Sequence, residues 1–121
     1  MKCLYPYKTS EGFEVGCGQC RWCRVHRTHE WAIRLVHELD SWPPGRALFL
    51  TMTYDDEHLP VVYDPATERV RATLVKTDFQ KYIKRVRKSI HPQKIRYFAC
   101  GEYGEETQRP HYHAIIYGIS P

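Results

Sequence analysis

The segment RPHYHAIIYG (109–118) constrains the fold more than any other, because it predicts a β-strand with two distinct faces. Side chains alternate across a strand, so His111 and His113 point to one face and Tyr112 points to the other. Two imidazoles at this spacing can converge on one ion. The segment therefore predicts a strand with a metal site on one face, with a pair of surface histidines on an edge strand as the plainer interpretation.

The remaining segments predict an α+β fold, in which helices pack on one face of an antiparallel sheet. Both expected helices carry an apolar stripe at spacings of three and four residues. The first is ended by paired prolines, and Thr77 or Asp78 is expected to cap the second. The expected elements are a loop over 1–18, helices over 19–40 and 76–90, strands over 47–55, 94–102 and 109–118, and a hairpin over 61–75 with its turn at 64–67.

Size and charge limit the classes of protein that need to be considered. The chain has 121 residues, of which 42% are hydrophobic, which suffices for one domain with a core. Eighteen basic residues against fourteen acidic ones give a net charge of +4, which permits a nucleic-acid partner without requiring one. The sequence shows neither a membrane span nor a signal peptide, so we expect no membrane partner, no secretion and a reducing compartment.

Glu102 ends the strand expected over 94–102 and would complete the metal site if that strand pairs beside the histidines. Two imidazoles and a carboxylate suit a divalent ion with open positions, so Mn²⁺ or Mg²⁺ is the expected cofactor. Such an ion can act as a Lewis acid on a phosphodiester. A zinc hydrolase is a rival hypothesis, but the sequence offers no H-E-x-x-H motif or similar set of ligands and base.

Three cysteines form the run Cys17-x-x-Cys20-x-x-Cys23, a spacing that favours a metal over disulfides in a reducing compartment. Structural zinc needs four ligands in a tetrahedron. The fourth is either Cys3, on a loop that could fold back, or His26, one helical turn beyond Cys23. Free thiols are the alternative to a structural zinc site.

Two further points concern the thiols. A ferredoxin-type iron–sulfur run would need Cys-Pro where this chain has Arg27 and Thr28, so zinc is favoured. Cys100 lies within an expected strand and is predicted to be a buried core thiol, since free cysteine is commonly buried.

The helix expected over 76–90 has a basic face that could contact a phosphate backbone in a salt-sensitive way. The candidate DNA-binding side chains on it are Lys81, Lys84, Arg85 and Lys88. A run of this kind is more often simply a solvated helix face. Arg109 lies next to the histidines in sequence and is better placed to hold a phosphate near the metal.

Three motifs together resemble the replication-initiation proteins of gokushovirus-type microviruses, which are HUH endonucleases named for two histidines around a bulky residue. The motifs are CGQCRWCRVHRTHEWAIRLVHE (17–38), FLTMTYDDEHLP (49–60) and FACGEYGEETQRPHYHAIIYG (98–118). The resemblance extends from Cys3 to Gly118. It implies an HUH-endonuclease fold with a ferredoxin-like or RRM-like core, incomplete here at the C-terminus.

The resemblance also implies roles for individual residues. His111 and His113 become the catalytic metal ligands, Glu102 completes their site, and Cys3 is favoured over His26 as the fourth zinc ligand. In this family the metal orients and polarises a phosphodiester of single-stranded DNA. A tyrosine then attacks, leaving a 5′-phosphotyrosine link and a free 3′-OH that primes rolling-circle replication.

The family's tyrosine lies downstream of the histidines, on a helix with a lysine four residues later. None of the nine tyrosines here has that setting: Tyr82 falls on an apolar stripe and Tyr112 points away from the histidines. We therefore expect the N-terminal part of a longer protein, or a fragment. Residues 1–45 would form a cysteine-containing segment with the first helix, and 46–121 a truncated endonuclease domain, the two packed as one unit.

The resulting hypothesis is a phage replication initiator that nicks and joins single-stranded origin DNA in the host-cell cytoplasm, with the host replication machinery as a further partner. The alternative is a non-catalytic, zinc-stapled nucleic-acid-binding module, in which the cysteines and the basic face act and the histidine pair is idle. Binding of Mn²⁺ or Mg²⁺ at the histidine pair would discriminate between them.

Overall fold

A computed structural model describes residues 2–121, so Met1 lies outside the described residues. The chain divides into two compact units, residues 1–41 and residues 42–121. This boundary lies close to the one expected at residue 45, and the packing of the two parts as one unit stays a prediction. The second unit contains the histidine motif and the first contains the cysteine run.

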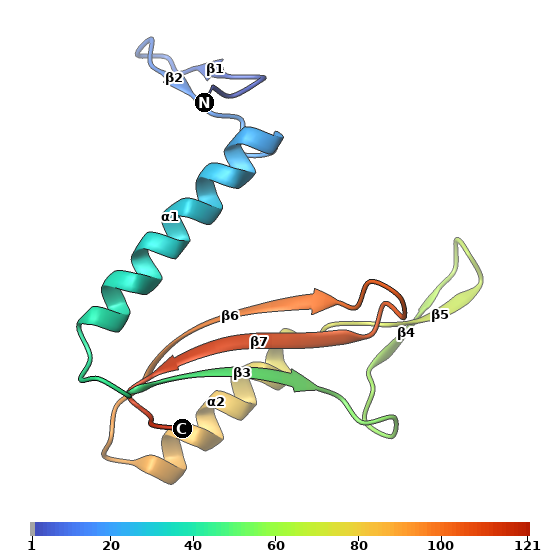
Figure 1. Cartoon of the computed structure of the whole chain (residues 1–121). Coiled ribbons are helices and arrows are strands. Elements are labelled where there is room, and N and C mark those ends of the chain that lie inside the picture. The colour runs from blue at the N-terminus through green and yellow to red at the C-terminus, as the bar shows by residue number, and fades with distance from the viewer. Residues whose placement is uncertain (1) are drawn as a thin grey trace. The chain divides into compact units, whose positions relative to one another are not determined.

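The first unit holds a small hairpin and a long helix (Figure 1). Strands β1 (Tyr7–Lys8) and β2 (Glu14–Val15) pair antiparallel, so the expectation of a loop throughout 1–18 is wrong for these residues. Their turn is closed by Thr9 and by Gly12, whose φ of 87° is readily adopted only by glycine. Such short strands have too few residues for an alternating pattern to announce them.

Helix α1 (Arg21–Asp40) confirms the expected helix and ends before the prolines. Its apolar stripe is not covered within the structure, because every residue of α1 is exposed or half-buried. Ile33 and Val36 are both more than half exposed. Periodicity correctly predicted the helix and its apolar face, but it could not supply a neighbour for that face.

A three-stranded antiparallel sheet forms the centre of the second unit, in the order β3-β7-β6. Its strands are β3 (Ala47–Thr53), β6 (Arg96–Tyr103) and β7 (Pro110–Tyr117). The histidine strand β7 is therefore the central strand of the sheet, and the interpretation of His111 and His113 as residues of an edge strand is wrong. The expected antiparallel pairing of β6 with β7 is confirmed.

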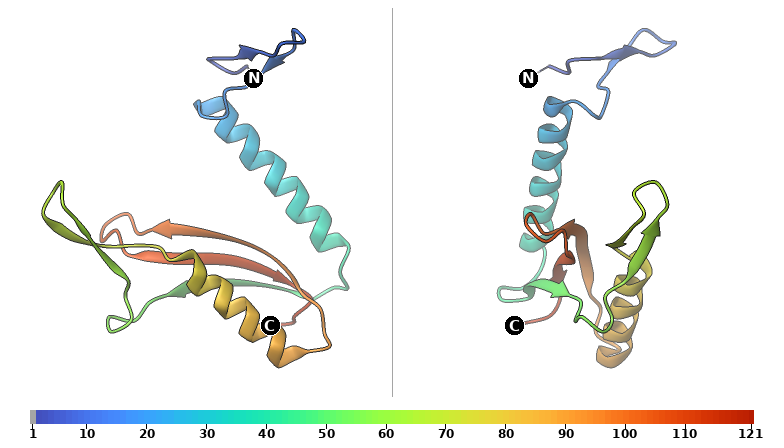
Figure 2. Two further views of the ribbon diagram at one scale, coloured as in Figure 1. Left: turned by 180° about the vertical axis from the view of Figure 1, so that it is seen from behind. Right: turned by 90° about the vertical axis from the view of Figure 1, so that its right-hand side faces the viewer.

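Helix α2 (Lys76–Ile90) lies along one face of this sheet (Figures 1 and 2). Its Phe79 and Ile83 are buried against the alternate residues Tyr112, Ala114 and Ile116 of β7. Burying apolar side chains from both elements is the main stabilising contribution here, at roughly 1.5–3 kcal/mol for each large side chain. The predicted α+β architecture, an antiparallel sheet with a helix packed on one face, is thus confirmed for this unit.

The start of α2 differs from expectation. The residue that precedes the helix is Val75, and neither Thr77 nor Asp78 acts as a side-chain cap in the described structure. The Tyr112 hydroxyl, which rises from the sheet, accepts a hydrogen bond from the Val75 N–H and donates to the Val75 carbonyl, both at 2.9 Å. Asp78 instead accepts a 2.8 Å hydrogen bond from the Tyr54 hydroxyl. Tertiary contacts have therefore replaced the local capping chemistry.

A second hairpin joins β4 (Val61–Asp64) to β5 (Arg69–Ala72), as the sequence predicted. Asp64 shapes the turn, because its carboxylate accepts hydrogen bonds from the Ala66 N–H at 3.0 Å and the Thr67 hydroxyl at 2.9 Å. Aspartate commonly initiates turns through such bonds to the following backbone.

Candidate metal centres

The register of the central sheet brings the three predicted ligands to one place. Glu102 of β6 lies directly opposite His111 of β7, and His113 lies directly opposite Thr51 of β3. These side chains alternate with Tyr112, which is buried under α2. The histidines and the carboxylate therefore share the sheet face that α2 does not cover.

The distances within this group suit a shared ion. The Glu102 Oε2 lies 2.9 Å from the Nε2 of His113 and 3.3 Å from the Nε2 of His111. The two imidazole rings are nearly perpendicular, with centroids 4.9 Å apart. One ligand atom from each of the three residues lies within 4.8 Å of the others. Both histidine side chains are partly buried, while that of Glu102 is about half exposed.

The other ring nitrogen of each histidine has a partner that orients the ring. The Nδ1 of His111 lies 3.2 Å from the Arg109 carbonyl, and the Nδ1 of His113 lies 3.1 Å from the Thr51 hydroxyl. Metal-binding histidines usually donate their second ring N–H to such an acceptor. The sequence did not point to either of these partners.

The Arg109 carbonyl has a chemical consequence for the site. A carbonyl can only accept, so the Nδ1 of His111 carries the proton, and a neutral ring then presents the Nε2 lone pair to Glu102. A lone pair and a carboxylate oxygen 3.3 Å apart repel each other unless a proton or a cation lies with them. The donor set present therefore fits a divalent cation.

The predicted phosphate-binding residue Arg109 is engaged elsewhere. Its guanidinium forms a 2.9 Å ion pair with Asp56 and donates to the Tyr54 carbonyl, both in the segment that follows β3. Arg109 thus joins this segment to β7 and also orients His111 through its own carbonyl. Phosphate binding by Arg109 stays a prediction.

The predicted basic face is formed by α2, and its members Lys81, Lys84, Arg85 and Lys88 are all exposed. Because α2 covers the sheet face opposite the histidines, these cations do not lie beside Glu102 and His111. The structure therefore separates two sets of residues that the sequence left side by side. Contact between this face and a phosphate backbone stays a prediction.

The four cysteines of the first unit form a second candidate metal centre. The Sγ atoms of Cys3, Cys17, Cys20 and Cys23 all lie within 4.8 Å of one another. Those of Cys3 and Cys20 are 3.8 Å apart, which matches the edge of about 3.8 Å of a sulfur tetrahedron around zinc with bonds of about 2.3 Å. Backbone N–H groups donate to the sulfurs, from Cys17 to Cys3 at 3.2 Å and from Cys20 to Cys17 at 3.3 Å.

These contacts alter the acidity of the thiols. Backbone hydrogen bonds from Leu4 and Cys23 lower the pKa of Cys20 to about 6, and those from Cys20 and Gln19 lower the pKa of Cys17. For Cys23 a backbone hydrogen bond from Gly18 lowers the pKa, but burial and the neighbouring thiols outweigh it and raise the pKa to about 11. The cluster therefore contains thiols that ionise readily, as metal binding requires.

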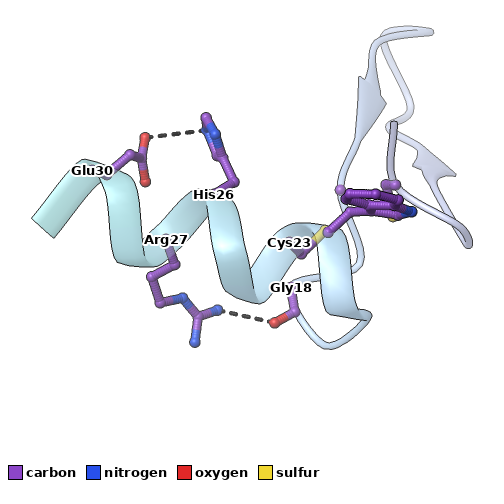
Figure 3. A pocket seen from close by; sticks show the side chains of 8 residues that line it. Gly18, Cys23, His26, Arg27 and Glu30 are labelled. Atoms are coloured by element: carbon purple, nitrogen blue, oxygen red, sulfur yellow. Dashed lines mark hydrogen bonds and ion pairs between the residues drawn. The ribbon is translucent and has the colours of Figure 1, made fainter. Parts of the chain in front are cut away.

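His26, the rival fourth ligand, is directed away from the sulfurs. It lies 3.5 Å from Glu30, one turn further along α1, and both line a pocket that adjoins the cysteines (Figure 3). In the same pocket Arg27 donates a 3.1 Å hydrogen bond to the Gly18 carbonyl, which ties the cysteine loop to the helix. The structure thus brings Cys3, and not His26, into the group.

Cys100 is exposed, so the prediction of a buried core thiol is wrong. The register explains the difference: Cys100 pairs with His113 and therefore lies on the uncovered face of the sheet. A single strand cannot reveal from its own sequence which of its two faces meets the core. The one-residue offset between Ala99, which packs on the core, and Cys100 decides the outcome.

No helix within residues 2–121 is both long enough and apolar enough to cross a membrane. The second unit is thus an α+β domain whose open sheet face carries a two-histidine, one-carboxylate group. Residues 47–121 match the model of a family of replication-associated proteins of the ORF2 type. The chain belongs to this family, and the resemblance to microvirus replication proteins is confirmed.

Three phage proteins illustrate the relationship. The chain is 34% identical to the replication-associated protein VP4 of Bdellovibrio phage phiMH2K over 94% of its length, and 36% identical to the replication-associated protein ORF2 of Spiroplasma virus 4 over 87%. It is 31% identical to the replication-associated protein ORF4 of Chlamydia phage 1 over 90%. The chain spans 35%, 32% and 25% of these relatives, respectively. No solved structure matches the chain.

Proposed function

We propose that the second unit is the metal-binding part of a phage replication initiator that nicks and joins single-stranded DNA to start rolling-circle replication. The observation that carries the proposal is the convergence of Glu102, His111 and His113 on the uncovered face of the central sheet. Its family membership agrees, because the relatives are named as replication-associated proteins of phages.

The residues present would divide the work in a simple way. Glu102, His111 and His113 would hold Mn²⁺ or Mg²⁺, which supplies Lewis-acid stabilisation of charge on a phosphodiester. Thr51 and the Arg109 carbonyl would keep the two imidazoles in position. The open sheet face leaves room for an extended strand to reach the group.

The nucleophile is assigned to a tyrosine downstream of the histidine pair, as the family resemblance implies. Its oxygen would form a bond to phosphorus while the 3′ oxygen leaves as a hydroxyl. Tyr112 is a poor candidate, because its side chain lies on the opposite face of β7. Tyr54 bonds to Tyr112 and Asp78, and burial with these contacts raises the pKa of Tyr54, which opposes formation of a phenolate.

The proposal can be tested by calorimetric titration of the chain with Mn²⁺ and with Mg²⁺. The His111→Ala/His113→Ala double variant should lose binding, whereas His29→Ala, which removes a histidine of α1 outside both metal groups, should retain it. In the full-length protein, His113→Ala should abolish metal-dependent cleavage of single-stranded DNA with little effect on folding. Cleavage at an unchanged rate by His113→Ala would refute the site.

We propose further that Cys3, Cys17, Cys20 and Cys23 hold one structural Zn²⁺, which would fasten the N-terminal segment to α1. The tetrahedral sulfur spacing and the N–H groups directed at the sulfurs support this assignment. The thiolate set suits zinc, while the oxygen and nitrogen ligands of the second unit suit a harder ion, so the two centres are expected to select different metals.

Elemental analysis should find about one zinc per chain. Cys20→Ser should lose the metal together with part of the helical circular dichroism, whereas Cys100→Ser removes a thiol outside the group and should retain both. His26→Ala should also retain zinc. Zinc that survives in Cys3→Ser but is lost in His26→Ala would show that the assignment of the fourth ligand is wrong.

A further inference from the structure

An exposed aromatic ring lies beside the histidine group. Phe49 of β3 is 65% exposed, although it sits within the central sheet. Its ring stacks on that of His113, with centroids 5.7 Å apart and an angle of 18° between the planes. One face of the Phe49 ring is therefore matched to a candidate metal ligand.

The register shows that Phe49 belongs to an apolar row across the sheet. Phe49 lies opposite Ile115 of β7, which lies opposite Phe98 of β6. We call these three residues the apolar row. The next row along the strands contains Thr51 and His113, and two residues of strand correspond to about 7 Å. The apolar row is thus directly adjacent to the candidate metal centre on the same face.

We propose that Phe49, supported by the apolar row, stacks a base of single-stranded DNA whose phosphate lies at Glu102, His111 and His113. This inference rests on the function proposed above and adds the residue that positions the strand. Every base has a π-face, so an aromatic platform binds a strand without requiring a particular sequence. A ring held parallel to His113 would place the stacked base immediately beside the metal-bound phosphate.

Three features favour a base over a protein side chain as the occupant. The neighbouring group is built to hold an anion through a cation, which matches the phosphate that accompanies each base. The chain also has a positive net charge of +4, which favours a polyanion. Finally, the row lies on the open face of the sheet, and extended single strands commonly lie across such faces on aromatic side chains.

The test compares binding of two probes in the presence of Mn²⁺, a fluorescein-labelled oligothymidylate of about 15 nucleotides, the upper end of the site sizes of single-strand binders, and an abasic strand of the same length. Phe49→Ala should weaken binding of the oligothymidylate about 10-fold, within the range found for loss of one base–aromatic stack. Phe49→Trp should retain it. Phe13→Ala is the matched control, because it removes a phenylalanine that is equally exposed, at 66%, from the first unit.

The abasic strand separates stacking from other causes. If a base stacks on Phe49, the wild type and Phe49→Ala should bind the abasic strand equally, and Phe49→Ala should leave Mn²⁺ affinity unchanged. A parallel loss of Mn²⁺ affinity would overturn the inference, because the ring would then act by orienting His113. An equal loss on both strands would also overturn it.

Two further outcomes distinguish this inference from the function on which it rests. If the unaltered chain binds Mn²⁺ and oligothymidylate but Phe49→Ala has no effect, the stacking role is refuted and the proposed function stands. If the unaltered chain fails to bind the oligothymidylate at all, both are refuted. A change in the sedimentation of the free chain with Phe49→Ala, without an effect on DNA, would instead identify an interface between copies and refute stacking.

Discussion

Thr51 is the residue whose role is easiest to isolate, because its hydroxyl meets the Nδ1 of His113 and takes no position in the ligand group itself. Thr51→Val keeps the shape and the strand preference but removes the hydroxyl. Loss of such a partner typically lowers metal affinity about 10- to 100-fold. We expect Mn²⁺ titration of Thr51→Val to show a loss near the lower end of this range, because Thr51 is exposed.

Thr53 provides the control for that measurement. It lies two residues further along β3 on the same face, opposite His111. Thr53→Val should leave Mn²⁺ affinity unchanged. Equal losses in both variants would mean that the polarity of the sheet face matters and that orientation of His113 does not.

Tyr112 makes a residue-scale prediction of the opposite kind, in which stability changes and metal binding does not. Tyr112→Phe leaves the N–H and carbonyl of Val75 without their partner at the start of α2. We expect the free energy of unfolding in urea to fall by about 1–3 kcal/mol. Tyr82→Phe, at a half-buried tyrosine packed against the core, should change it much less. Loss of Mn²⁺ binding in Tyr112→Phe would contradict the separation of the two sheet faces.

Among the elements, the β4–β5 hairpin should respond to pH through Asp64. Hydrogen bonds from Thr67 and Ala66, with the nearby Arg71, lower the pKa of Asp64 in the folded state. A lowered folded pKa means that the contribution to stability is complete above the ordinary value of about 4 and is lost as pH falls through the folded pKa. Amide exchange in residues 61–72 should therefore accelerate at low pH. Asp64→Asn, which keeps an acceptor, should abolish this dependence.

The elements also show what sequence patterns can predict. The alternation over 109–118 correctly separated the histidine face from the Tyr112 face, because strand geometry dictates it. Asp64 marked the hairpin turn through local hydrogen bonding. The pairing of Glu102 with His111 followed once the two strands were taken to be neighbours. These successes depend on periods and short-range bonds that a sequence displays directly.

The failures all depend on tertiary neighbours. Cys100 was predicted to be buried, and only the register with His113 shows that it faces outward. Asp78 has the chemistry of a helix cap, but Tyr54, which follows β3, occupies it. Thr51 and Phe49 gave no sequence signal of their own, because their importance arises from lying beside His113 on another strand. Such relations cannot be read from one segment at a time.

At the scale of the whole molecule, each of the two compact units contains one candidate metal centre. The cysteine group is closed, with all four tetrahedral positions supplied by sulfur, as in structural sites. The histidine group supplies three ligands and leaves positions open, as a site that acts on a substrate requires. This difference in ligand number is why we assign a structural role to the first centre and a chemical role to the second.

The basic face of α2 leads to the last prediction. Its lysines lie on the far side of the sheet from Glu102, His111 and His113, so a strand stacked on Phe49 would not meet them directly. Their field would still attract DNA over about 10 Å at about 0.1 M salt. We therefore expect Lys81→Gln/Lys84→Gln/Lys88→Gln to slow association with oligothymidylate severalfold at low salt and to leave dissociation unchanged. In stopped-flow measurements the difference should vanish at about 0.5 M salt, where screening is much stronger. Faster dissociation would instead reveal direct phosphate contacts by this face.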